Sequence, residues 1–393
     1  MVENYRHLYV IIELEDEKFL PVSLEMLGEA RRLLDDFNKK YSTKEKVVAV
    51  VLGHNIKNIS KQLIEYGADA VIFSDSPELK DVRNTIYTKV ISQIAQDIKT
   101  LAEVEPEYAS EIKRPRYMFF AADSIGRHLS STVLAELESG LASDINKLVI
   151  EDIEMSHQHK TAGKKETFAK TLEMYRPDFS GFLWTTILCL DNRNTAYKRD
   201  YHPQGCSMIP GVFEPMKPDS SRQGKVIEFI PTIDEQDLKV KVLSRKIIES
   251  EVDFDTPRTI VSFGRGIKDD PEQNVKLIEQ LAKELNAEIG VTLPISKKPY
   301  VVSSALDSKY MIPDRVIGTS GHKTSPLLYI AAGVSGAMQH VWGMKDSGFV
   351  VAINPDEDAP IKDECDIFIK GRMEDVIPLL IEEIKKQMLV VEA

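Results

Sequence analysis

The sequence has few cysteines and no long apolar run, and both absences exclude whole classes of protein. Three cysteines, Cys189, Cys206 and Cys365, occur among 393 residues, and none lies in a C-x-x-C pair. An iron–sulfur cluster usually takes four thiolates and a structural zinc site at least two closely spaced cysteines, so we expect no metal site. Three dispersed thiols fit a reducing compartment, which makes the cytoplasm the expected location. No stretch approaches the ~20 apolar residues of a membrane span, and the N-terminus does not have the pattern of a signal peptide.

Positive charge is in deficit, and several familiar motifs are missing. Fifty Lys and Arg residues face 62 Asp and Glu residues, giving a net charge of −12, which argues against sequence-independent binding to nucleic acid or anionic lipid. No G-x-G-x-x-G follows the first expected strand, and neither a Walker A loop nor a G-x-S-x-G elbow occurs. A standard dinucleotide fingerprint, a P-loop and a serine hydrolase are therefore not predicted.

What the sequence does contain is a regular alternation of apolar runs and helical patterns. At roughly 150 residues per domain, its length predicts two or three domains. In the first part, expected strands alternate with expected helices: strands 8–14, 46–52, 70–73 and 117–121, and helices 22–34, 56–66, 81–102 and 124–140. Continuous apolar strands separated by helices indicate a parallel sheet covered on both faces, and hence an α/β fold. Shorter strands at 147–153, 169–175, 182–190 and 226–230 are expected to complete this domain.

A second α/β pattern follows a charged stretch at 231–257, which we expect to contain a strand and a linker. We place the domain boundary near 245–257, giving domains 1–245 and 257–393. The expected strands of the second domain are 259–263, 287–292, 315–317, 328–332, 349–353 and 367–370, with helices at 271–285 and 373–388.

Glycine-rich loops follow three of these C-terminal strands. Ten of the 20 glycines lie after residue 256, and the loops are 264–266, 318–322 and 333–340. In open parallel sheets, ligands bind at the carboxyl ends of the strands, where glycine admits backbone close to a phosphate. Three such loops at one edge would suit a dinucleotide. The alternative is that the glycines only form tight turns.

Individual polar residues in these loops can likewise be interpreted either as ligand-binding or as structural residues. Arg265 could bind a phosphate through two N–H groups or lie over an aromatic ring, or it could be a surface arginine in a turn. His340 could donate to a ligand oxygen or be structural. His157 and His159 form an H-x-H pair, but with no further ligand at a recognised spacing a structural role is favoured over a metal site.

These loops also carry a resemblance to a known family. Gly264-Arg-Gly266, the run from Leu328 to His340 containing G-V-S-G-A-M-Q-H, and Val351-Ala-Ile-Asn-Pro-Asp356 resemble the electron transfer flavoprotein alpha subunit, or FixB, family. Residues 21–28, 64–70, 124–144 and 210–215 are also similar, so the resemblance covers nearly the whole chain.

The resemblance implies an N-terminal α/β domain that packs on a beta subunit and a C-terminal Rossmann-like domain that binds FAD. It places Arg265 near the flavin or its diphosphate, Ser320 near flavin N5, and Ser335, Gly336, Ala337 and Gln339 around the ribityl–diphosphate part. His340 would approach flavin O2 and stabilise the reduced ring, and Asn354 would contact the adenosine half. The other implied cofactor-binding residues are Thr292, Gly318, Thr319, Gly333 and Arg372.

The sequence departs from the family pattern at the cofactor. Leu293 stands where the family usually has an arginine over the isoalloxazine, Thr319 and His322 replace a glutamine and a lysine, and an acidic position falls at about Arg372. Loss of a cation beside the flavin should lower its potential, because positive charge favours the reduced anion. Lys297, Lys298 and His322 are the candidates to compensate.

The function implied is that of an electron carrier, not a self-sufficient enzyme. The chain would form a heterodimer with a beta subunit and pass electrons between a flavin dehydrogenase, such as an acyl-CoA dehydrogenase, and a second redox partner. A quinone oxidoreductase, a ferredoxin and a bifurcating complex stay open. The departures motivate an alternative, a nucleotide-binding structural subunit that has lost the redox flavin, and a nicotinamide-dependent enzyme is a third possibility.

Overall fold

The protein is described from a computed structural model, which covers residues 4–15, 18–108, 112–177, 183–245, 252–254 and 258–391. The chain divides into two compact units, Met1–Arg245 and Lys246–Ala393. Each unit is built on its own parallel sheet, so the predicted two-part α/β architecture is confirmed. None of the described helices combines the length and apolarity that crossing a membrane requires.

The N-terminal unit is a seven-stranded sheet in the order β12-β5-β4-β1-β6-β11-β7, with every pair parallel. Its strands are β1 (Tyr5–Ile12), β4 (Val47–Gly53), β5 (Ala70–Asp75), β6 (Arg114–Ala121), β7 (Leu141–Ile145), β11 (Gln204–Met208) and β12 (Lys225–Glu228). The helices are α1 (Pro21–Tyr41), α2 (Lys57–Ser60), α3 (Gln62–Glu65), α4 (Asn84–Gln96), α5 (Ile98–Val104), α6 (Ser124–Glu136) and α7 (Gln158–Thr161). Two short strands, β2 (Leu14–Glu15) and β3 (Lys18–Phe19), form a separate hairpin.

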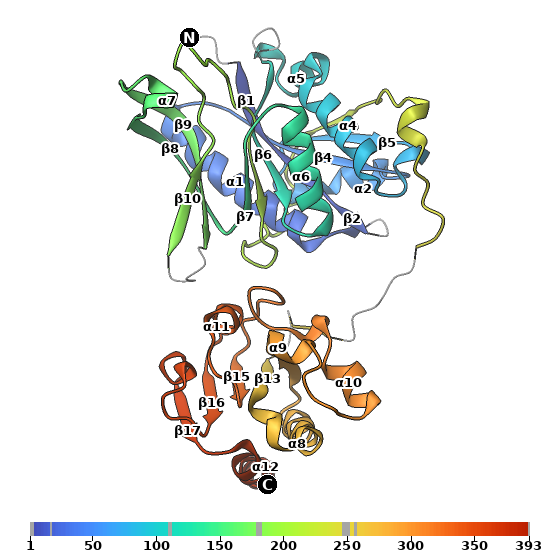
Figure 1. Ribbon diagram of the computed structural model, residues 1–393. Helices are drawn as coiled ribbons and strands as arrows, with labels where there is room; N and C mark the ends of the chain where they lie inside the picture. Colours follow the sequence, from blue (N-terminus) through green and yellow to red (C-terminus); the bar gives the residue numbers. More distant parts are fainter. Residues whose placement is uncertain are drawn as a thin grey trace. The chain divides into compact units, whose positions relative to one another are not determined.

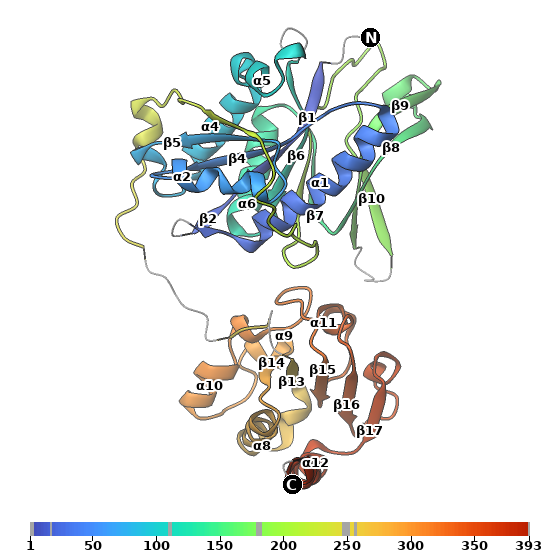
Figure 2. The same ribbon diagram turned by 180° about the vertical axis from the view of Figure 1, so that it is seen from behind.

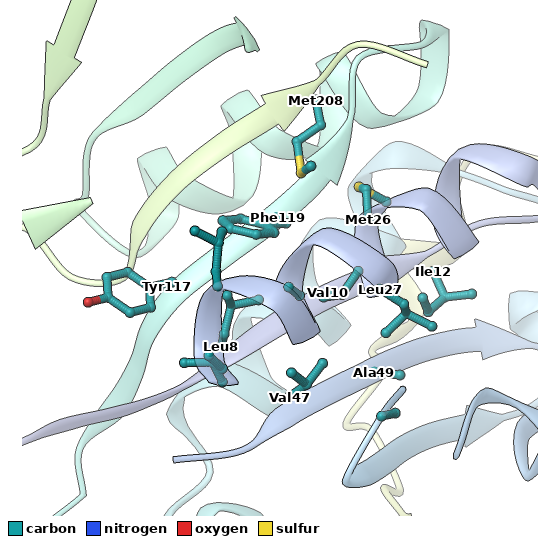
Figure 3. Packing of buried hydrophobic residues seen from close by; sticks show 14 of the residues in the cluster. Leu8, Val10, Ile12, Met26, Leu27, Val47, Ala49, Tyr117, Phe119 and Met208 are labelled. Carbon is teal, nitrogen blue, oxygen red and sulfur yellow. The ribbon is translucent and has the colours of Figure 1, made fainter. Parts of the chain in front are cut away.

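Helices cover both faces of this sheet, as Figures 1 and 2 show from opposite sides. Alternate side chains of the central strand β1 enter different cores, because successive residues of a strand point to opposite faces. Leu8 and Val10 pack with α1 residues such as Met26 (Figure 3), whereas Tyr9 and Ile11 pack with α4 and α6. β1 is therefore buried on both faces, which explains its continuous apolar sequence.

An antiparallel sheet in the order β10-β9-β8 extends from the same unit. It consists of β8 (Lys147–Ser156), β9 (Lys165–Pro177) and β10 (Trp184–Leu188). The expected strand at 182–190 is shorter than predicted, and its first residue, Phe182, lies outside the described residues. The expected strand in 231–257 is absent from its described part; a 3-10 turn, Glu235–Leu238, is found there, and Lys89 binds Asp234 and Asp237 beside it.

The C-terminal unit is a five-stranded parallel sheet in the order β14-β13-β15-β16-β17. Its strands are β13 (Thr259–Phe263), β14 (Glu288–Val291), β15 (Leu328–Ala332), β16 (Val350–Asn354) and β17 (Ile367–Lys370). Its helices are α8 (Pro271–Glu284), α9 (Leu293–Ser296), α10 (Ser304–Tyr310), α11 (Met338–Met344) and α12 (Met373–Val391). Figure 1 shows these elements in yellow to red.

The predicted strand at 315–317 is wrong. Val316 and Ile317 make only isolated bridges, to Val291 and His322, because the Arg315 side chain is used to fix a turn instead. Its guanidinium donates to the carbonyl oxygens of Lys309 and Ile289, and Gly318 then turns the chain with a φ of +141°.

Candidate functional site

A large cavity lies along the carboxyl edge of the C-terminal sheet, within that unit. Its volume is about 1050 Å³, slightly above the ~300–1,000 Å³ typical of ligand clefts. Its wall is built from the segments that follow β13, β14, β15, β16 and β17, as open parallel sheets place their ligands. The predicted site residues that line it are Arg265, Thr292, Gly318, Thr319, Ser320, Gly333, Ser335, Ala337, Gln339, His340, Asn354 and Arg372.

Gly336 is the exception among the predicted site residues, because it does not line the cavity. A Cβ at this position would lie 2.1 Å from the backbone nitrogen of Ile361. Its glycine is required by close packing of the β15 loop on the segment after β16, and its φ of +81° also favours glycine.

Two glycines bring the loops after β13 and β15 into backbone contact. A Cβ on Gly266 would lie 2.5 Å from the Cα of Gly333, and a Cβ on Gly333 would lie 2.8 Å from the Cα of Gly266. The amide of Gly266 also donates to the carbonyl oxygen of Gly333 at 3.0 Å. This contact joins the two loops at the floor of the cavity. Because glycine has no side chain, the backbone of the two loops is left uncovered there.

Two cations on the loop after β13 have no partner among the described residues. Arg265 and Lys268 are exposed, both line the cavity, and neither forms an ion pair or a side-chain hydrogen bond. Unpaired positive charge beside open backbone is the arrangement that binds a phosphate or diphosphate. The site therefore fits the anionic part of a dinucleotide.

Short polar side chains complete the accessible wall. Thr319, Ser320, Ser335 and Gln339 are exposed, and their side chains make no hydrogen bond to any described residue. The amide of Thr319 is bound to the carbonyl oxygen of Gln339 at 2.8 Å, which joins the two loops that carry these groups. The free hydroxyls and amide remain available to a ligand.

His340 lines the cavity and is held by neighbouring groups of the protein. The residue is only 4% exposed; Nδ1 lies 2.9 Å from the carbonyl oxygen of Ile317, and Nε2 lies 3.0 Å from the Tyr329 hydroxyl. Burial lowers the pKa of His340 to about 4, against the opposing effect of the Ile317 carbonyl. Both ring nitrogens therefore have protein partners in this geometry.

The side chain of Asn354 is also hydrogen-bonded to other groups of the protein. Its Nδ2 donates to the carbonyl oxygen of Val334 at 2.8 Å, and its Oδ1 accepts from the amide of Asp356 at 2.9 Å. The side chain holds two cavity loops together, so its role here is to shape the wall.

Arg372, the replacement for an expected acidic residue, forms ion pairs at one end of the cavity. It pairs with Asp269, and with Glu374 at 3.2 Å. These two carboxylates raise the pKa of Arg372, and they offset its charge toward a ligand. Arg265 and Lys268 are therefore the lining cations without a carboxylate partner among the described residues.

Leu293 contributes no charge to its part of the cavity wall. Leu293 and Tyr300 both line this side, and the Tyr300 hydroxyl donates to the carbonyl oxygen of Arg265 at 3.2 Å. None of the residues proposed to compensate for Leu293 lines the cavity: Lys297 lies outside it, Lys298 pairs with Asp307 at 2.8 Å, and His322 packs against Phe254.

Several lining residues were missed by the sequence reasoning, among them Lys268, Asp269, Tyr300, Asp356 and Glu374. Lys268 could have been found from the sequence, since it lies three residues after Arg265, beside the same glycine-rich loop.

His157 and His159 do not form a common ligand site, and each contacts other residues of the protein instead. His157 caps α7 by accepting from the amide of Lys160, and His159 contacts Asn192. No group of three or more His, Cys, Asp or Glu side chains in the described ranges is arranged to hold a metal ion.

Comparison with known proteins explains this combination of a parallel sheet and an anion-binding cavity. Residues 253–345 match the electron transfer flavoprotein FAD-binding domain, and residues 8–179 match the electron transfer flavoprotein domain. The electron transfer flavoprotein subunit alpha of Thermoanaerobacterium thermosaccharolyticum is 35% identical over 98% of this chain and 99% of its own length. The chain belongs to the electron transfer flavoprotein alpha subunit family.

Other relatives of the family extend the similarity. The protein FixB of Clostridium saccharobutylicum is 32% identical, with 98% of each chain covered. The acryloyl-CoA reductase electron transfer subunit beta of Anaerotignum propionicum is 29% identical over 98% of this chain and 97% of its own. The predicted family and FAD as cofactor are therefore confirmed.

Proposed function

We propose that this family member holds FAD in the cavity of its C-terminal unit and carries electrons between a flavin dehydrogenase and a second redox partner. Bound FAD supplies the redox chemistry. The observation that carries the proposal is the pair of unpartnered cations, Arg265 and Lys268, beside the glycine contact of Gly266 and Gly333.

The chain's own residues would divide the work of binding. Arg265 and Lys268 would hold the diphosphate, and Ser335 and Gln339 offer free hydrogen-bonding groups from the loop after β15. Thr319 and Ser320 would face the flavin end, next to Thr292 and Leu293. Gly318, Gly333 and Ala337 would leave room for the cofactor, while Asn354 and Arg372 would shape the opposite end.

The partners follow from the family. The chain would form a heterodimer with an electron transfer flavoprotein beta subunit, with the N-terminal unit as the packing surface. The name of the Anaerotignum relative supports a dehydrogenase or reductase that acts on an acyl-CoA as one partner. A quinone oxidoreductase or a ferredoxin would be the second partner, and a second flavin on the beta subunit would permit bifurcation.

The test is FAD binding by the heterodimer after coexpression with the beta subunit. We expect one FAD to be lost from the purified complex when Arg265→Ala and Lys268→Ala are combined. Lys283→Ala, an exposed lysine on α8 outside the cavity, serves as the control and should retain it. Equal FAD content in the double variant and the control would overturn the assignment of this cavity.

A second candidate is favoured by the same cavity. Leu293 and the ion-paired Arg372 weaken the case for a redox-tuned flavin, and they suit a subunit that holds a nucleotide structurally. Purification of the complex with ADP or AMP in place of FAD, and no uptake of FAD on reconstitution, would select this alternative.

A further inference from the structure

Three charged side chains meet at the rim of the cavity. Arg372, in the turn between β17 and α12, pairs with Asp269 and, at 3.2 Å, with Glu374. All three residues line the cavity. The side chains of Asp269 and Arg372 are 50% and 52% exposed, so this pair lies where the cavity opens to solvent.

The pair joins the segments that follow two strands which are not neighbours. Asp269 follows β13 and Arg372 follows β17, and β15 and β16 lie between these strands in the sheet. The segments after all four strands line the cavity. The first and the last of these four segments are therefore tied to each other by one ion pair.

The helices that begin beyond the pair, α8 and α12, are held together in two different ways. Buried apolar residues that do not line the cavity, Val275, Ile278 and Ile377, belong to the core between them. At the cavity end, the Asp269–Arg372 pair is joined by a hydrogen bond of 3.4 Å from Asn274 Nδ2 to Glu374 Oε1. Because an exposed ion pair breaks more easily than a buried apolar core, the cavity end can open while the helices stay packed.

We propose that Asp269 and Arg372 form a clasp at the rim which slows both the entry and the release of the dinucleotide. This proposal rests on the proposed function of the cavity. Because the pair joins protein to protein, it forms with or without a ligand and acts on the rates in both directions. An exposed ion pair contributes little free energy, so we expect each rate to rise about two- to fivefold when the clasp is lost.

The rate of FAD release from the heterodimer tests the clasp, measured by the recovery of flavin fluorescence on dilution. Asp269→Ala and Arg372→Met should both release FAD about two- to fivefold faster than wild type. A role in charge alone predicts opposite effects of the two changes. Loss of the carboxylate would slow the release of an anionic ligand, whereas loss of the guanidinium would speed it.

Glu284→Ala is the matched control. Glu284 pairs with Lys385 at 3.2 Å, which joins the same two helices, but neither residue lines the cavity. Its loss removes one negative charge, as Asp269→Ala does, and should leave the release rate unchanged. Asp269→Arg combined with Arg372→Asp rebuilds the pair with its charges reversed and should restore slow release. A flavin on the beta subunit would give a phase common to all variants.

Release that is unchanged or slower in Asp269→Ala, or equally fast in Glu284→Ala, would overturn the proposal, as would fast release from the reversed pair. A wild type that takes up no FAD would count against the proposed function instead. Hydrogen exchange of the ligand-free heterodimer then tests the clasp by itself. Peptides covering residues 265–270 and 371–376 should exchange faster in Asp269→Ala and Arg372→Met than in wild type, and equal exchange would refute the clasp.

Discussion

The side chain of Asn354 donates from Nδ2 to the carbonyl oxygen of Val334 at 2.8 Å, which ties the end of β16 to the loop after β15. Both residues are buried, and the same amide accepts from the backbone of Asp356. One side chain thus fixes two of the segments that form the cavity wall.

We therefore expect Asn354→Ala to destabilise the C-terminal unit by about 1–3 kcal/mol, because the buried carbonyl oxygen of Val334 and the partly buried amide of Asp356 lose their partner. The free energy of unfolding from urea titration measures this effect, and FAD affinity should fall with it. Asp358→Asn, on the exposed part of the same loop, is the control and should change stability little. An unchanged free energy in Asn354→Ala would show that water replaces the side chain.

Gly333 should not tolerate even a methyl group. Its φ is +61°, and a Cβ would lie 2.4 Å from the Cε of Met373 as well as close to Gly266. Gly333→Ala should therefore separate the two loops and abolish FAD binding, measured by the flavin absorbance of the purified complex. Gly211→Ala separates crowding from strain, because Gly211 also has a positive φ, +75°, with nothing within 4 Å. Gly211→Ala should lower the free energy of unfolding by only ~1–2 kcal/mol. Equal losses of stability in Gly333→Ala and Gly211→Ala would contradict the argument that crowding is the cause.

Glu13 makes the stability of the N-terminal unit depend on pH. Burial, with the Asp123 carboxylate as a second cause, raises the pKa of Glu13 to about 8 from 4.5. A folded-state pKa above the unfolded value means that the proton favours folding. The stabilisation is complete below about pH 4.5 and is lost as the pH rises toward 8.

Glu13→Gln should remove this dependence. Its free energy of unfolding relative to wild type should increase between pH 5 and pH 9, by at most about 5 kcal/mol. Denaturant titrations at both pH values provide the measurement. Glu136→Gln, an exposed glutamate on α6, should show no such trend. A constant difference between Glu13→Gln and wild type across this range would rule out the raised pKa.

Leu293 offers a direct test of how the cavity tunes its cofactor. The side chain is 39% exposed and lines the cavity at the start of α9, where it provides no charge. Leu293→Arg should raise the midpoint potential of bound FAD, on the order of 30–60 mV, because a cation stabilises the reduced anion. Leu293→Gln, of similar length but neutral, should shift it much less. A potential that is unchanged or lower in the arginine variant would place this wall away from the flavin ring.

The sheets were largely predictable because their strands are buried on both faces. β13 and β15 have the predicted bounds, and β1, β4 and β16 differ from theirs by a few residues at their ends. β7 and β11 were missed. Their sequences, L-A-S-D-I and Q-G-C-S-M, are short and partly polar. They are strands because β11 pairs with β6 on one side and with β7 on the other. Such pairing joins residues far apart in the chain, so local periodicity does not reveal it.

The candidate site could also be predicted only in part, because tertiary contacts decide the rest. Glycine and polar residues after parallel strands were enough to locate the loops, since strand ends of a parallel sheet meet at one edge. Residue type did not reveal that His340 and Asn354 would bind carbonyl oxygens of neighbouring segments, or that Arg372 would pair with Asp269, 103 residues earlier. These partners are set by the tertiary fold.

The most direct test of the central claim is hydrogen–deuterium exchange of the heterodimer with and without FAD. FAD should protect peptides that cover residues 264–269, 333–340 and 354–360, and should leave the seven-stranded sheet of the N-terminal unit unchanged. Protection confined to the beta subunit, or to the N-terminal unit of this chain, would contradict the assignment of FAD to this cavity.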